Sequence, residues 1–261
     1  MAFGLECRFL ASCRFPMSQD SSKDNLFAKP LPHLVDFAFD EQVASVFPDM
    51  IRRSVPGYET VIAMLGVFAS QYVRPHTQVY DLGCSQGAAT LAIRRHITCP
   101  DVRIVAVDNS ESMIERCKNN VAADLSPTEV QCLCEDIQNV PITQASLVTL
   151  NYTLQFIPLQ QRDSLLASLA QGIEPGGALI LSEKIQFPDA GQQAAFTDLH
   201  HEFKRLNGYS DLEISQKRQA IENVLIPETL EAHERRLKQA GFSQVHCWFQ
   251  CFNFASLIAV K

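Results

Sequence analysis

A short loop between an apolar strand and a helix carries the residue types that a nucleoside-binding site needs. Residues 77–90 read TQVYDLGCSQGAAT, in which the strand ends at Asp81 and a turn with Gly83 and Gly87 leads into the helix. Glycine lets the backbone turn sharply and approach a ligand, which the first N–H groups of the helix then face. A second strand, VRIVAV, ends at Asp108, about 20 residues after the last glycine, where such folds present an acid to ribose hydroxyls. The two features together predict a nucleoside site.

The residues of the turn distinguish between two nucleoside ligands. The turn reads D-x-G-x-S-x-G, whereas dinucleotide-binding loops read G-x-G-x-x-G. The leading acid suits the α-ammonium group of S-adenosylmethionine (SAM) better than the pyrophosphate of NAD. A glycine turn by itself also serves packing in many α/β domains, so the prediction of SAM depends on the turn and Asp108 together.

Polar residues also follow the third and fourth strands that the sequence predicts. Strand 130–134 is followed by Asp136 and Ile137, and strand 146–151 ends in Asn151. The carboxyl ends of parallel strands line the ligand crevice of an open sheet, so Asp136 is placed to accept from an adenine amino group and Ile137 to cover a ring face. The alternative is that Asp136 only caps the next turn.

The order of the elements predicts an α/β fold with a mostly parallel sheet, because strands and amphipathic helices alternate through the middle of the chain. Before them, residues 37–53 predict a helix broken at Pro48, which lacks the N–H that would continue it. After them, the polar residues 189–223 are too many for a plain crossover and predict a helical insertion. The last two strands, 244–249 and 252–260, are expected to form an antiparallel pair.

Composition and charge limit the possible functions. The chain has 261 residues, 46% of them hydrophobic, which suits one domain; we expect it at residues 26–261, after a disordered tail at residues 1–25. The net charge of -7 argues against a nucleic-acid-binding face. Nine cysteines without a CxxC pair indicate packed thiols in a reducing cytoplasm and no metal site. No apolar run is long enough to cross a membrane.

Five longer runs of the sequence are similar to those of one known family. They are FDEQVASVFPDMIRRSVPGY, QVYDLGCSQGAATL, EPGGALILSEK, HHEFKRLNGYSDLEISQKR and WFQCFNFASLIAVK. Through them the chain resembles the bacterial carboxy-S-adenosyl-L-methionine synthase family, from about Leu26 to Lys261. The resemblance implies an α/β, Rossmann-like class I methyltransferase fold, with a mostly parallel seven-stranded sheet, an antiparallel C-terminal strand and the helical insertion.

The resemblance also implies a reaction. Members of that family convert SAM and prephenate to carboxy-SAM, phenylpyruvate and water, and carboxy-SAM then serves a separate enzyme that forms 5-oxyacetyl uridine at the tRNA wobble position. By the same resemblance we expect a cytoplasmic homodimer that does not itself bind nucleic acid. Two other functions stay open: a conventional SAM-dependent methyltransferase, and a non-catalytic partner in tRNA modification.

The resemblance assigns individual residues to the ligand. It places Arg218 on the carboxylate of carboxy-SAM, where a guanidinium can make two parallel charge-assisted bonds. The sequence alone would instead make Arg218 a solvated charge on an amphipathic helix. His200 and His201 are candidates for a general base, although paired histidines on a helix are more often surface or packing residues. The other implied contacts are Tyr58, Gly83, Cys84, Ser85, Asp108, Asn109, Asp136, Ile137 and Asn151.

Overall fold

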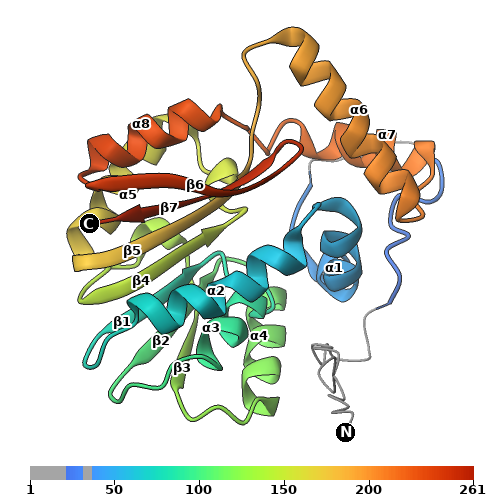
Figure 1. Ribbon diagram of the computed structural model, residues 1–261. Coiled ribbons are helices and arrows are strands. Elements are labelled where there is room, and N and C mark those ends of the chain that lie inside the picture. Colours follow the sequence, from blue (N-terminus) through green and yellow to red (C-terminus); the bar gives the residue numbers. More distant parts are fainter. Residues whose placement is uncertain (1–21, 32–36) are drawn as a thin grey trace, which may run out of the picture.

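A seven-stranded sheet organises the part of the chain that the computed structural model describes, residues 22–31 and 37–261. The strand order is β3-β2-β1-β4-β5-β7-β6 (Figure 1), and β7 runs antiparallel to both of its neighbours while β1 to β5 are parallel. The predicted fold class is therefore confirmed. The strands are β1 (Gln78–Leu82), β2 (Arg103–Asp108), β3 (Glu129–Cys134), β4 (Ala145–Asn151), β5 (Ile173–Lys184), β6 (Gln244–Cys251) and β7 (Phe254–Val260).

Helices cover both faces of the sheet. One core packs α5 and α8 against it, and two further cores pack α2, α3 and α4 against the opposite face. Among the described residues, no helix combines the length and the apolar character needed to cross a bilayer. The helices are α1 (Glu41–Ser54), α2 (Tyr58–Tyr72), α3 (Ala88–Arg94), α4 (Glu111–Ala123), α5 (Leu159–Gly172), α6 (Ala190–Leu206), α7 (Asp211–Ile221) and α8 (Leu230–Ala240), with short 3-10 turns η1 (Ile137–Asn139) and η2 (Leu154–Phe156).

The central strands β1 and β4 determine where a ligand can bind. Both are buried along most of their length, as expected for parallel strands covered on two faces. The chain builds the sheet outward from β1 through β2 and β3, and then in the other direction from β4. Ligands of open α/β sheets bind where the order reverses, at the carboxyl ends of the strands. That point lies at the loops after β1 and β4.

The predicted break at Pro48 is wrong, because α1 continues through the proline from Glu41 to Ser54. Proline removes the hydrogen bond that its N–H would donate to the carbonyl four residues earlier, here that of Ala44. The Gln86 side chain donates to the Ala44 carbonyl instead, with 2.6 Å between Nε2 and O. The helix is thereby joined to the loop after β1, and its N-terminus is capped by Asp40.

The helical insertion consists of α6 and α7 and lies beside α1 at the end of the sheet where the parallel strands finish (Figure 1). Asp189 caps α6, and a capping box of Ser210 and Glu213 begins α7, as polar residues at helix starts favour. Arg53 of α1 donates from Nε to the carbonyl of Asn207 at 2.7 Å. The insertion is therefore held against α1, over the strand ends.

The start of the folded region lies earlier than the sequence indicates. Residues 1–21 of the expected tail lie outside the described residues, but Asp24 is 1% exposed. Its backbone N–H donates to Asp49 at 2.9 Å, and its backbone carbonyl accepts from Arg53 at 2.9 Å. The segment around Asp24 is thus packed between α1 and the helical insertion, so the domain includes residues before Leu26.

Candidate functional site

The loop after β1 has the close backbone approach that its glycines predict. Gly83 has a φ of 78°, and a Cβ at this position would lie 2.2 Å from Thr153 Oγ1, so a larger residue does not fit. The N–H groups of Gly83 and Cys84 donate to the Val107 carbonyl at 2.8 and 2.9 Å. The loop is therefore fixed to the end of β2 and to the loop after β4.

Asp108 connects the first two strand ends. Its Oδ2 accepts from the backbone N–H of Ser85 at 2.9 Å, and its Oδ1 accepts from the N–H of Ser110 at 2.9 Å. Burial raises the pKa of Asp108, against these two hydrogen bonds. Each oxygen keeps a further lone pair, so the carboxylate can still accept from ribose hydroxyls.

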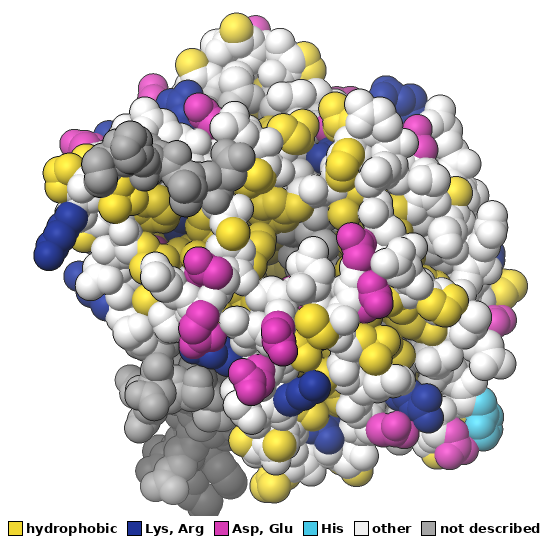
Figure 2. All heavy atoms as spheres, turned by 180° about the vertical axis from the view of Figure 1, so that it is seen from behind, with side chains coloured by type: hydrophobic (Ala, Val, Ile, Leu, Met, Phe, Trp, Pro, Cys, Tyr) yellow, Lys and Arg dark blue, Asp and Glu magenta, His cyan; other side chains and the backbone are white. Residues whose placement is uncertain are grey.

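These loops open on one cavity of about 590 Å³, which extends from the strand ends to α1 and the helical insertion. Figure 2 shows hydrophobic side chains gathered around a hollow on the face of the molecule opposite to the view of Figure 1. A cavity of this size suits a small-molecule ligand. Nine of the ten site residues that the sequence predicts line it: Tyr58, Gly83, Cys84, Ser85, Asp108, Asn109, Asp136, Ile137 and Asn151.

Asp81, which leads the turn, has a structural role in addition to the contact with an α-ammonium group that the sequence predicts. Its carboxylate is buried and accepts from the Thr90 hydroxyl at 2.6 Å and from the Thr149 hydroxyl at 2.9 Å. Burial raises its pKa, and it contributes with burial to raising the pKa of Tyr58. Asp81 lines the cavity, and its two oxygens also hold α3 and β4 in place; each oxygen keeps a further lone pair, so the contact with an α-ammonium group stays a prediction.

The residues after β3 line the cavity and also shape their own turn. Asp136 accepts from the backbone N–H of Gln138 at 2.9 Å and caps η1, so the alternative role as a turn cap is realised. Ile137 is 6% exposed, which fits an apolar cover for a ring face. Asn109 is exposed at the rim.

Asn151 at the end of β4 supplies an observation that points to a ligand. Its Oδ1 accepts from Ser182 at 3.0 Å, but its buried Nδ2 has no partner among the described residues. A buried donor without a partner costs free energy unless something binds to it. Together with the backbone cradle at Gly83, this free donor fits an adenosyl ligand with a polar tail.

Arg218 lies outside this lining. Its side chain is 63% exposed, and its Nε is 3.9 Å from Glu222 Oε2 on the same helix. Burial is the main cause that lowers the pKa values of Lys184, Lys204 and His201, and the Arg218 guanidinium lowers them further, as a like charge does. The predicted contact with a ligand carboxylate stays a prediction.

The two candidate histidines differ in their surroundings. His200 is 5% exposed, and its Nε2 lies 2.8 Å from the Ser54 carbonyl, a geometry in which the ring N–H donates. Burial and the neighbouring Lys204 lower its pKa to about 2, so the ring is neutral at ordinary pH. His201 is half-buried, and burial lowers its pKa as well. His200 lines the cavity with its Nε2 already engaged.

Sequence reasoning missed two groups of lining residues. One is an aromatic wall, formed by Phe37, Phe39, Phe47, Tyr152, Phe156 and Phe254; the other is a set of three lysines, Lys184, Lys204 and Lys217. Lys184 had a usable signal, because it ends β5 as Asn151 ends β4. The lysines of α6 and α7 had none, since charges on a polar helix are usually solvated.

The described residues contain no group of three or more His, Cys, Asp or Glu side chains arranged to hold a metal ion. The cysteines described are free thiols, and the Sγ atoms of Cys117 and Cys132 are 3.8 Å apart. Burial raises the pKa of Cys84, which keeps this cavity-lining thiol protonated.

Sequence comparison identifies relatives along almost the whole chain. Residues 79–177 match the family described as Methyltransferase domain. A carboxy-S-adenosyl-L-methionine synthase of Shewanella oneidensis is 58% identical over 242 residues, which cover 93% of this chain and 100% of that protein. A protein of the same name from Histophilus somni is 55% identical over 240 residues, covering 92% of this chain and 100% of that protein.

Solved structures with a similar fold are distant in sequence. Magnesium protoporphyrin IX methyltransferase from Synechocystis has a TM-score of 0.56 and 14% identity, covering 81% of this chain and 87% of that one. Human N-acetylserotonin methyltransferase has a TM-score of 0.56 and 15% identity, covering 85% of this chain and 55% of that one. These structures support the fold, and the close relatives support the family. This chain therefore belongs to the carboxy-S-adenosyl-L-methionine synthase family, and it is an enzyme that uses SAM.

Proposed function

We propose that this enzyme forms carboxy-SAM and phenylpyruvate from SAM and prephenate. The observation that carries the proposal is the shape and charge of the cavity. Its lining includes the Gly83 turn and the acid Asp108, six aromatic side chains, Lys184 at the end of β5 and two lysines of the helical insertion. A nucleoside suits the turn and the acid, and an anionic ring compound suits the aromatic side chains and the cations.

The chemistry of the reaction accounts for the aromatic side chains and the cations in the lining. Prephenate loses a carboxyl group and its ring hydroxyl as the ring becomes aromatic. The SAM methyl carbon loses a proton, which combines with the hydroxide to give water, and bonds to the carbon of the released carbon dioxide. The product thus carries an extra carboxylate, which is costly to bury without a partner, and the cations at this end supply one.

The protein's own contribution is to position both substrates and to exclude water. Asn151 is expected near the sulfonium end of SAM, where its Nδ2, without a partner among the described residues, can donate to an oxygen acceptor and not to the sulfonium itself, and Asp108 is available to the ribose. The aromatic wall then covers the ring of prephenate. Arg218, from its own or a neighbouring subunit, approaches the carboxylate of the product. No general base is needed from His200, whose ring is already bonded to the Ser54 carbonyl.

The test is to incubate the purified enzyme with SAM and prephenate and to follow phenylpyruvate by absorbance. Mass analysis of the nucleoside formed identifies the product. The proposal predicts phenylpyruvate in step with a nucleoside that is one carboxyl group heavier than SAM. A methylated acceptor and S-adenosylhomocysteine would instead indicate a conventional methyltransferase, and an inert protein that retains RNA would indicate a non-catalytic partner in tRNA modification.

The biological setting belongs to the same proposal. Carboxy-SAM would supply a second enzyme that forms 5-oxyacetyl uridine at the tRNA wobble position, in the cytoplasm. The net charge of -7 supports a role without direct tRNA binding. We also propose a homodimer, supported by the leucines that the helical insertion exposes, Leu199, Leu206 and Leu212. Sedimentation of the full chain tests that assembly.

A further inference from the structure

Three lysines from three separate elements line the helical end of the cavity. Lys184 ends β5, Lys204 lies in the last turn of α6, and Lys217 lies in α7. Lysine is seldom buried without a partner, because its ammonium loses hydration. Three of them around one cavity therefore require an explanation, which differs from one lysine to the next.

Lys217 has its partners within the fold. It is 7% exposed, its Nζ donates to the Ser54 hydroxyl at 2.9 Å, and the same nitrogen lies 3.6 Å from Asp24 Oδ2. It also lies over the Tyr209 ring, 5.3 Å from the centroid. These contacts join α7 to α1 and to the N-terminal segment, so a structural role accounts for Lys217.

Lys184 and Lys204 have no such partners. Both are half-buried, and in the described residues neither ammonium makes a hydrogen bond or an ion pair. The charged groups that face Lys204 are the cations Lys217, Lys184 and Arg218. Burial, and then these cations, lower the pKa of Lys204 to about 7, and burial and Arg218 lower that of Lys184.

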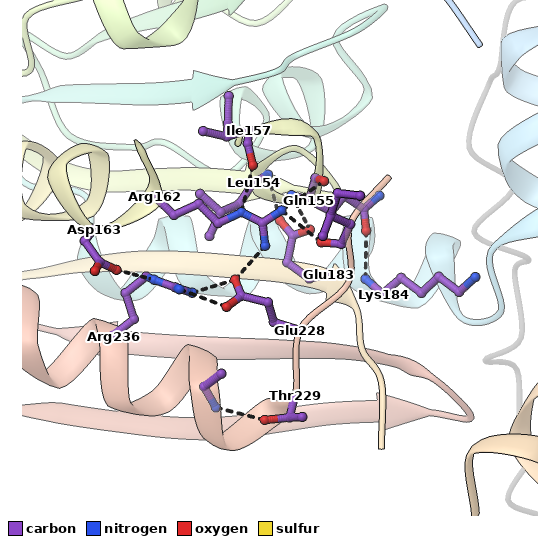
Figure 3. A network of polar contacts seen from close by, with 12 residues as sticks. Leu154, Gln155, Ile157, Arg162, Asp163, Glu183, Lys184, Glu228, Thr229 and Arg236 are labelled. Carbon is purple, nitrogen blue, oxygen red and sulfur yellow. Dashed lines mark hydrogen bonds and ion pairs between the residues drawn. The ribbon is translucent and has the colours of Figure 1, made fainter. Parts of the chain in front are cut away.

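The sheet directs Lys184 into the cavity. Neighbouring residues of a strand point to opposite faces, and Glu183 points the other way, accepting from the backbone N–H groups of Leu154 and Gln155 at 2.9 and 3.0 Å. Figure 3 shows the Lys184 side chain extending away from that network. Its backbone N–H donates to Gln155 Oε1 at 3.0 Å, which fixes the end of β5.

We infer that Lys184 and Lys204 form the subsite for the carboxylates of the second substrate, a compound with two carboxylate groups. This inference rests on the proposed function, because prephenate is such a dianion. Two ammonium groups without acidic partners among the described residues match two carboxylates in number and charge. Phe254, the register partner of Lys184, and Tyr152, whose ring centroid lies 6.1 Å from that of Phe254, supply an aromatic cover for the ring between the carboxylates. Arg218 is then left for the new carboxylate on the product, so the substrate and the product use different cations.

The subsite has a consequence that a binding measurement detects. A bound dianion stabilises the protonated form of Lys204, so binding at neutral or slightly alkaline pH takes up protons. At pH 7.5 a lysine that titrates near 7 in the empty cavity takes up as much as about 0.8 proton. Lys184, Lys217, Arg218, His200 and His201 also face this region; the Lys238→Met control keeps all of them together with Lys204, whereas Lys204→Met also removes the charge that lowers the pKa values of His200 and His201 after burial.

The experiment uses Lys184→Met and Lys204→Met, which keep an apolar side chain and remove the charge. Lys238→Met, on the exposed face of α8, is the matched control. We expect the KM for prephenate to rise about tenfold or more in each cavity variant, with the Kd of SAM within about twofold of wild type. We also expect the empty Lys204→Met protein to melt about 2–4 °C higher than wild type, because a repelled charge has been removed.

Calorimetry supplies the readout that does not depend on turnover. Prephenate is titrated into protein loaded with S-adenosylhomocysteine, in buffers of different ionisation enthalpy, and the proton uptake is calculated. Wild type and Lys238→Met should take up protons, and Lys204→Met should take up far fewer. Normal prephenate KM and normal proton uptake in both cavity variants would overturn the subsite.

Two further outcomes are also decisive. Parallel losses of SAM and prephenate affinity would overturn the assignment, because the lysines would then serve the nucleoside. If wild type forms carboxy-SAM while the cavity variants keep their prephenate KM, the subsite fails and the proposed function stands. If wild type forms no carboxy-SAM from prephenate, both fail.

Discussion

Two pairs of cations among the described residues, Arg162 with Arg236 and Lys184 with Lys204, are at least partly shielded from solvent and differ in their partners. Arg162 is 0% exposed at the side chain, pairs with Glu228, and donates from Nε to the Ile157 carbonyl at 2.8 Å; Arg236 pairs with Glu228 and with Asp163 (Figure 3). Lys184 and Lys204, by contrast, line the cavity without an acid among the described residues.

The difference indicates that the paired arginines serve stability and that the unpaired lysines serve binding. A guanidinium surrounded by acceptors holds the segments that supply them, here η2, α5 and the chain before α8. An ammonium left without an acceptor lowers stability until a ligand supplies one, a cost that functional sites commonly carry. Buried charge alone therefore does not mark a site, whereas buried charge without a partner does.

The largest effect is expected on the paired side. Arg162→Met removes the donor of the Ile157 and Ile226 carbonyls and one of the two donors of the Gln155 carbonyl, and it leaves Glu228 with one partner fewer, so unfolding should require about 3–5 kcal/mol less. Urea unfolding measures this. The control is Arg103→Met, which breaks an exposed pair with Glu129 and should cost less than about 1 kcal/mol. Equal costs for the two would show that burial of Arg162 adds nothing.

The next effect is expected at the nucleoside end. Asp108→Asn keeps one acceptor oxygen and places an NH2 group against one of the two backbone donors that Asp108 now binds. We expect the affinity for SAM to fall about 10- to 100-fold, as one unsatisfied buried donor costs about 1–3 kcal/mol. Calorimetric titration with SAM measures it, with Asp101→Asn at an exposed loop as control. Unchanged affinity would remove Asp108 from the site.

Arg218→Ala tests the exposed cation beside the cavity. Removal of the guanidinium should weaken carboxy-SAM binding about tenfold and leave SAM binding within about twofold, because only the product carries the additional carboxylate. Competition titration with the two nucleosides measures the ratio. Equal losses for both would contradict the role assigned to Arg218.

A smaller effect is expected from the histidines. His200→Gln combined with His201→Gln should lower the turnover number only a few-fold, because the neutral His200 ring is bonded to a backbone carbonyl and glutamine can still donate there. Steady-state kinetics and SAM binding of the double variant provide the measurement. Abolished turnover with intact SAM binding would establish a histidine as an essential base.

A further effect concerns the pH dependence of the empty enzyme. Lys204 titrates near 7 in the fold and near 10.4 when unfolded, so between these values the unfolded chain binds more protons. This group therefore makes stability rise as pH increases from about 7 to about 10. Urea unfolding of wild type and Lys204→Met across this range isolates the contribution. The variant should show the shallower rise, and identical slopes would mean that Lys204 is not perturbed.

The parts of the site that follow from the sheet could be predicted from the sequence. The strands end in Asp108, Asn151 and the Gly83 turn, and parallel strands bring their carboxyl ends together. The position of these residues along the chain was therefore sufficient to predict that they line one site. The structural role of Asp81 was not predicted, because its partners, Thr90 and Thr149, come from separate elements. Pattern reasoning cannot detect a hydroxyl that arrives from another strand.

The helical end of the cavity could not be predicted in the same way. Lys204 lies on an amphipathic helix whose sequence does not state which face meets the sheet, and its site exists only once α6 packs beside α1. The continuation of α1 through Pro48 has the same cause, since the donor that replaces the lost hydrogen bond is Gln86, far along the chain. Tertiary contacts decide both features.

The most direct test of the account is the identity of the nucleoside that the wild-type enzyme produces from SAM and prephenate. Mass analysis should find a nucleoside heavier than SAM by one carboxyl group, formed in equal amount with phenylpyruvate. Recovery of SAM unchanged, with prephenate intact, would contradict the claim that the cations of this cavity serve a carboxylate.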